Sequence, residues 1–222
     1  LEEQFHFHPL AMEDVRKQRQ RPKVEGYEDY FFLVVRTVQY HPNNHRIDSH
    51  EIDIFLGRNY LISIHPGKIA ELEQVRHRWK QLTPQTASTS YLGYLMVDAV
   101  VDGYFPVMDQ IGEVIDEIDN RLLAKPDNPL IQTIFTLRKS LLTARKLLGS
   151  MRDALNELMQ SEEAGRLHGG VNGARLFFRD VYDHVLRATD FIDTYRDMLS
   201  GSLEAYQSSL ANKLNQNMQR LT

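Results

Sequence analysis

The chain has 222 residues, of which 42% are hydrophobic and 25% are charged, with a formal net charge of −4 and no cysteine. This length and apolar content are sufficient for one or two hydrophobic cores. The net charge argues against a nucleic-acid partner, and the absence of cysteine excludes disulfide frameworks, thiolate metal sites and cysteine nucleophiles.

The first third of the chain predicts a small mixed α/β domain. Proline at position 9 favours the start of a short helix at His8-Pro9-Leu10. Aromatic and β-branched residues then predict strands, Gly57-Arg58-Asn59 predicts a hairpin turn, and an amphipathic pattern predicts a helix. The expected strands are Tyr27–Tyr40, His50–Leu56 and Tyr60–His65, and the expected helix is Ile69–Leu82.

After the polar linker TPQTASTS the pattern is helical to the end. We expect three long helices, at about Tyr91–Ala124, Leu130–Gln160 and Val171–Thr222. The fold class is therefore α+β, with predicted domains at residues 1–83, 84–170 and 171–222. The last helix would be about 70 Å long at a rise of ~1.5 Å per residue, which is the length of a stalk rather than of a compact-domain helix.

Carboxylates are the most prominent candidate ligands. The first long helix carries seven acidic residues, among them Asp98 and Asp102, and several share a face. These acids form either a solvated face or a weak site for hydrated divalent cations. Glu13-Asp14 and Asp180 offer further oxygen ligands suited to hard cations, although helix capping and salt bridges also explain them.

Other sequence signatures of chemistry are missing. The nine histidines show no zinc-binding spacing, and isolated surface histidines explain them. No Walker loop, GxGxxG or GxSxG motif is present, so we do not expect an enzyme.

The end of the last helix changes character after Glu204, where acidic residues stop. One stripe at helical spacing collects Glu204, Ser208, Ala211, Asn215 and Met218. Several copies around an axis would place this stripe inward, as in a pore, whereas a single coiled-coil seam with a register-fixing asparagine is the other interpretation.

Three stretches resemble the cytosolic part of the CorA family of magnesium and divalent-cation transporters. They contain the phrases RPKVE, DAVVDGYFP and FRDVYDH, and they follow one another in the order found in that family. The resemblance implies an α/β/α cytosolic domain with a mixed sheet, and a homopentameric funnel whose stalk helices continue into the membrane.

The resemblance also implies roles for individual residues. Glu13 and Asp14 match an acidic pair that meets Asp180 across a subunit boundary and holds regulatory Mg2+, and either Asp98 or Asp102 joins that site. Met218 and Leu221 match gate positions, Asn215 matches a polar ring beside them, and Glu204 stands at an acidic pore ring. The cation that the resemblance implies is Mg2+, with Co2+, Ni2+, Zn2+ or Ca2+ as further candidates.

The resemblance sets the expected location and mechanism. The family's GMN signature and both membrane helices would lie beyond Thr222, and strands usually found before FHPL are absent, so we expect an excised piece from the cytoplasmic face of the inner membrane. Bound Mg2+ would hold subunits together with the pore closed. A zinc-transporting relative and a soluble helical scaffold are the alternatives.

Overall fold

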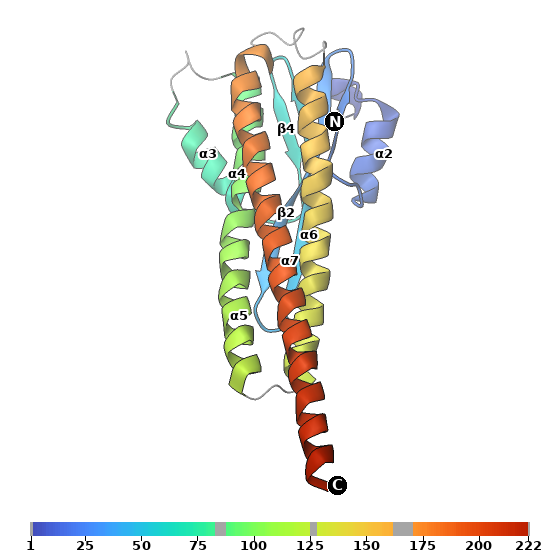
Figure 1. Ribbon diagram of the computed structural model, residues 1–222. Coiled ribbons are helices and arrows are strands. Elements are labelled where there is room, and N and C mark those ends of the chain that lie inside the picture. The colour runs from blue at the N-terminus through green and yellow to red at the C-terminus, as the bar shows by residue number, and fades with distance from the viewer. Residues whose placement is uncertain (1, 83–87, 125–127, 162–170, 222) are drawn as a thin grey trace.

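The computed structural model describes residues 2–82, 88–124, 128–161 and 171–221. The first half holds a sheet with short helices, and the second half is helical (Figure 1). In chain order the elements are α1 (Glu2–Phe5), α2 (Pro9–Lys17), β1 (Lys23–Gly26), β2 (Tyr30–His41), β3 (Arg46–Gly57), β4 (Leu61–Ile64), α3 (Ala70–Trp79), α4 (Thr89–Asp102), α5 (Tyr104–Ala124), α6 (Asn128–Gln160) and α7 (Val171–Leu221).

The four strands form one sheet in the order β1-β2-β3-β4, and every neighbouring pair is antiparallel. The two long central strands, β2 and β3, set the register of the sheet, with Phe32 opposite Phe55. The expectation of a mixed sheet was therefore wrong for the described residues. Short hairpins join each strand to the next, and parallel neighbours would need a long crossover instead.

Alternation along β2 divides its side chains between two cores. Phe31, Leu33 and Val35 belong to the main core on the side of the long helices. Phe32 and Val34 belong to a smaller core that includes Met12 of α2. The sheet thus lies between α2 and the long helices, which confirms the α/β/α arrangement.

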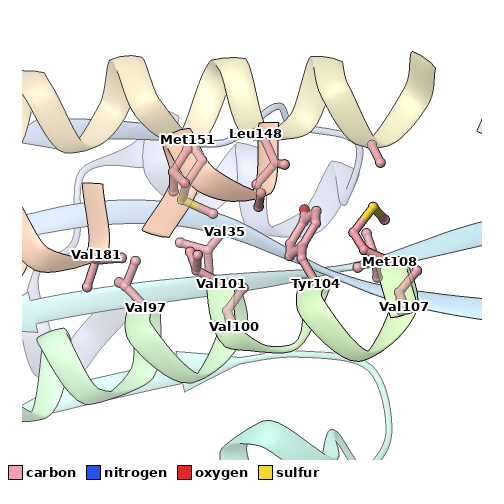
Figure 2. Packing of buried hydrophobic residues seen from close by; sticks show 14 of the residues in the cluster. Val35, Val97, Val100, Val101, Tyr104, Val107, Met108, Leu148, Met151 and Val181 are labelled. Atoms are coloured by element: carbon pink, nitrogen blue, oxygen red, sulfur yellow. The ribbon is translucent and has the colours of Figure 1, made fainter. Parts of the chain in front are cut away.

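The main core joins the sheet to the long helices. Figure 2 shows Val97, Val101 and Tyr104 pointing toward side chains of β2, α6 and α7. The ring of Tyr104 is fully buried, and its hydroxyl donates a 3.0 Å hydrogen bond to the carbonyl of Arg36 on β2. All three predicted domains contribute to this core, and their boundaries stay a prediction.

The first expected long helix is two helices, because α4 ends at Asp102 and α5 begins at Tyr104. Gly103 separates them, and Pro106 follows three residues later. Proline has no N–H to donate to the carbonyl four residues earlier, here that of Asp102, and its ring crowds that carbonyl. The helix is therefore interrupted between α4 and α5, while both helices still contribute to the same core.

Helix α7 runs for 51 residues, as its length in the sequence predicted. Its first part packs against α4, α5 and α6, and its C-terminal turns project beyond the ends of those helices (Figure 1). Among the described residues, no helix combines the length and the apolar character that crossing a membrane requires.

Candidate metal centre

Two polar side chains meet where α4 packs on α7. Asp98 lies on α4 next to the core residue Val97, and His184 lies on α7 next to the core residue Val185. Both helices turn an apolar stripe toward the shared core, so a polar residue at the border of each stripe is carried to the helix contact. The fold thereby joins residues from two of the predicted domains.

One ligand atom from each of Asp98, Asp180 and His184 lies within 4.8 Å of the other two. The Nδ1 atom of His184 is 3.8 Å from Oδ1 of Asp98, and its Nε2 atom is 3.9 Å from Oδ2 of Asp180. Asp102 adds a carboxylate oxygen 3.3 Å from Nδ1. In the part of the chain that the structure describes, Asp98, Asp180 and His184 are the group of three side chains that could ligate a metal ion.

Two buried atoms of this cluster make no hydrogen bond to the described residues and could therefore ligate an ion. Asp98 is only 7% exposed, and neither its Oδ1 atom nor Nδ1 of His184 has a hydrogen-bond partner among the described residues. Burial, and then the negative charge of Asp102, raise the pKa of Asp98. A buried carboxylate with an unpartnered oxygen is costly, and a bound cation would remove that cost.

Aromatic packing holds the imidazole of His184 in place. The ring of Phe105, the second residue of α5, lies edge-on to that of His184 with centroids 6.2 Å apart. The guanidinium of Arg187 covers Phe105 at 4.7 Å. The break after α4 therefore also places an aromatic ring beside the candidate ligand, which restricts its rotation.

The predicted acidic pair lies elsewhere in the chain, on α2. Glu13 is half exposed and pairs with Lys17 one turn later. The carboxylate of Asp14 is only 20% exposed and lies 2.6 Å from the ammonium of Lys23 on β1. Because α2 covers the face of the sheet opposite to α4 and α7, the fold does not bring the pair to Asp180 within one chain.

A polar cluster lies beneath α2, on the same face of the sheet. Glu51 is 4% exposed and pairs with Arg36 at 2.7 Å, and the backbone N–H of Gln20 donates to the same carboxylate oxygen. Asp53 is 1% exposed, and its Oδ1 atom has no hydrogen-bond partner among the described residues. Burial, assisted by the charges of Glu51 and Asp14, raises the pKa of Asp53 to about 7.

The predicted pore residues all lie on α7. Glu204 is exposed, and Met218 is 67% exposed near the C-terminal end. Asn215 and Leu221 belong to the helix, but their side chains fall outside the described residues. Asp180 and Met218 are 38 residues apart on one helix, or about 57 Å at ~1.5 Å per residue.

Sequence reasoning placed Asp98, Asp102 and Asp180 among the candidates, and the structure brings all three to His184. It missed His184, which was grouped with the surface histidines. The available signal was the spacing of Asp180 and His184 in FRDVYDH, because residues four apart share a helix face. The resemblance paired Asp180 with Asp98 or Asp102, but nothing in the sequence placed the His184 imidazole beside them.

Comparison with known proteins identifies the family. A family model described as "CorA-like Mg2+ transporter protein" matches residues 1–222. The cobalt/magnesium transport protein CorA of Thermotoga maritima is 32% identical over 220 residues, which cover 98% of this chain but only 62% of that protein.

Two solved structures share the fold. The complete CorA magnesium transporter of Methanocaldococcus jannaschii has a TM-score of 0.83 at 22% identity, over 99% of this chain and 68% of that one. The ZntB cytoplasmic domain of Vibrio parahaemolyticus has a TM-score of 0.78 at 17% identity, over 95% and 82% of the two chains. Because the family match covers the whole length, this chain belongs to the CorA-like Mg2+ transporter family.

Proposed function

We propose that this chain is the cation-sensing, regulatory part of a divalent-cation transporter, in which cations bound between the subunits of a homopentamer keep the pore closed. The observation that carries this proposal is the cluster of Asp98, Asp180 and His184. It joins α4 to α7, and two of its buried atoms, Oδ1 of Asp98 and Nδ1 of His184, have no hydrogen-bond partner among the described residues.

The donor set suits a hydrated divalent cation. Carboxylate oxygens are preferred by Mg2+ and Ca2+, and Mg2+ retains several waters when few protein ligands are available. Asp180 and Asp102 are more than half exposed and leave room for such waters. The carboxylates of Asp98 and Asp180 would hold the hydrated ion, with Asp102 at its edge and the His184 imidazole beside them.

The acidic pair would complete the binding region from a second subunit. Glu13 and Asp14 lie on α2, at the outer face of the sheet, where a neighbouring chain can approach. A cation shared between this pair and Asp180 of another copy would neutralise facing carboxylates and hold the two subunits together.

Cation binding near Asp180 would regulate the gate because α7 connects the two. If Mg2+ binds the closed assembly more tightly than the open one, its binding shifts the population toward closed pentamers. When Mg2+ falls, the uncompensated carboxylates repel and the subunits separate. The continuous helix would carry that change to the predicted gate at Met218 and Leu221, and the pore and membrane helices belong to the full-length protein.

Replacing Asp180 by alanine is the direct test. In the unsubstituted chain we expect Mg2+ to slow proteolysis of α7, and in Asp180→Ala we expect this protection to need at least about fivefold more Mg2+, since a carboxylate ligand contributes on the order of 1 kcal/mol or more. Asp183→Ala removes the same charge from an exposed position nearby and serves as the control. Equal Mg2+ dependence in Asp180→Ala and the parent would contradict the sensor assignment.

A zinc-transporting relative is the second candidate, and the imidazole of His184 favours it. Nitrogen ligands suit Co2+, Ni2+ and Zn2+ better than Mg2+. We expect His184→Ala to weaken Co2+ or Zn2+ binding at least tenfold in calorimetry while changing Mg2+ binding less than threefold, because Mg2+ binding relies on the carboxylates. Metal uptake by the full-length protein then decides the transported ion.

The remaining predictions concern the class of protein. The family consists of transporters, so the chain is not an enzyme. The same membership argues against the alternative of a scaffold protein without a transport role. A location at the cytoplasmic face of the inner membrane belongs to the proposal, and fractionation of cells that produce the full-length protein tests it.

A further inference from the structure

The carboxylate of Asp14 is already held by two donors from its own subunit. The ammonium of Lys23 lies 2.6 Å from Oδ2, and the side-chain amide of Gln20 donates to Oδ1 at 2.6 Å. Both oxygens are thus engaged in the isolated chain. A divalent cation that binds Asp14 therefore has to compete with a positive charge that the fold supplies.

Lys23 is fixed in this position by further contacts. Its ammonium lies 2.5 Å from Oε1 of Glu25 on the same strand, and it lies 5.6 Å from the centre of the Phe32 ring. Lys23 is only 27% exposed, so the ammonium is partly shielded from water and salt. It is consequently a stronger competitor than a freely moving surface lysine.

The contact with Glu25 also makes displacement possible. A lysine that left Asp14 without another partner would be a partly buried, uncompensated charge, which is unfavourable. Lys23 instead keeps Glu25, whose second oxygen accepts a 2.9 Å hydrogen bond from the hydroxyl of Tyr27. The arrangement therefore permits exchange between two states, with either Lys23 or a divalent cation on Asp14.

The neighbouring pair of Glu13 and Lys17 is different. It lies on the exposed side of α2, with side-chain exposures of 50% and 63%. Such pairs are screened by salt and contribute little. Glu13 and Asp14 therefore form a matched comparison. Each acid pairs with one lysine, but the pair of Glu13 is exposed and the pair of Asp14 is mostly buried.

We infer that Lys23 is a built-in competing cation that lowers the affinity of Asp14 for divalent ions and so raises the concentration at which the sensor responds. This inference rests on the proposed function, because it concerns the same acidic pair. Linkage requires that removal of a competitor for a site tighten binding at that site. Lys23 is thus an affinity-setting residue, and it contacts Asp14 directly.

The test measures the Mg2+ concentration that gives half-maximal protection of α7 in the 222-residue chain. We expect Lys23→Met to lower this concentration about 3- to 10-fold, in line with a partly buried charge pair. We expect this decrease to persist in 0.5 M KCl. Lys17→Met should change the value less than twofold, and Lys23→Arg should leave it near that of the parent. An unchanged or higher value in Lys23→Met overturns the inference, since structural damage alone does not tighten binding.

Glu25→Gln provides a second variant that leaves Lys23 in place. Without its alternative partner, Lys23 should bind Asp14 more persistently, so the half-maximal Mg2+ concentration should rise about threefold. A fall or no change in this variant contradicts the exchange between the two states. Melting temperatures near that of the parent confirm that each variant is folded.

Asp14→Asn separates this inference from the proposed function. If Asp14→Asn leaves Mg2+ protection unchanged, the acidic pair is not a sensor ligand, and both ideas fail. If Asp14→Asn weakens protection while Lys23→Met does not strengthen it, only the role of Lys23 fails. Weakening by the first and strengthening by the second supports both.

Discussion

Replacing Tyr104 by alanine is expected to lower the free energy of unfolding by about 4 kcal/mol, the typical cost of removing a large buried aromatic side chain. The ring of Tyr104 is completely buried and lies between β2 and the long helices (Figure 2). Its loss leaves a cavity at the joint between α4 and α5, and it also leaves the carbonyl of Arg36 without its donor.

Tyr104→Phe is the matched control for that experiment, because it removes only the hydroxyl. We expect it to cost about 1 kcal/mol, the usual net value of one intramolecular hydrogen bond. Urea unfolding at pH 7, followed by circular dichroism, measures both variants. If Tyr104→Ala costs no more than Tyr104→Phe, the ring does not hold the sheet to the helices.

Replacing Asp53 by asparagine is expected to raise the free energy of unfolding at pH 8 by about 2 kcal/mol. The Asp53 carboxyl is buried beside Glu51 and Asp14, and its pKa rises from 3.8 to about 7. A shift of this size corresponds to roughly 4 kcal/mol at ~1.4 kcal/mol per pKa unit. We expect about half of this gain in stability, because the amide of asparagine still leaves a buried polar atom without a partner at the site.

The sign of the pH dependence follows from proton binding. Between pH 4 and pH 7 the folded chain keeps a proton on Asp53 that the unfolded chain has lost, so the contribution of Asp53 to stability falls as the pH rises through this window. Asparagine cannot release a proton. The stability difference between Asp53→Asn and the parent should therefore be smallest below pH 4 and should grow until about pH 7.

Asp48→Asn is the control, since its side chain is 63% exposed and pairs only with the surface histidine His41 among the contacts of the described residues. Its stability should stay within about 0.5 kcal/mol of the parent at each pH. Urea unfolding at pH 4, 6 and 8 makes the comparison. A destabilised Asp53→Asn at pH 8 would mean that the carboxylate has a partner that stabilises its charged form.

The elements with strong periodic patterns were predictable from the sequence. Helix α7 needed only a long apolar repeat without proline, and α2 needed a proline in its first turn. The prediction missed β1, whose four residues, KVEG, carry a single buried apolar side chain, Val24. Such a short edge strand gains its structure from pairing with β2, and its own residues carry too weak a pattern to predict it.

The ends of β3 show the same limit. The strand was expected to begin at His50, but it begins at Arg46 and pairs with β2 as far as His41. Of its first five residues only Ile47 is apolar and buried, and Arg46, Asp48 and His50 are exposed, so this part carries no apolar pattern of its own. The register of the hairpin extends the strand beyond the continuous apolar run.

The oxygen donors among the candidate ligands came from the sequence, because the chain has many carboxylates and no cysteine. The imidazole of His184 was not predicted. Which ligands meet was decided by the tertiary structure. Asp98 and His184 are 86 residues apart, and their contact depends on how α4 and α7 pack on a common core. Likewise, Lys23 reaches Asp14 only because the sheet places β1 beneath α2. Periodicity reports the face of each helix that is buried, whereas the partner of that face is chosen by packing over the whole chain.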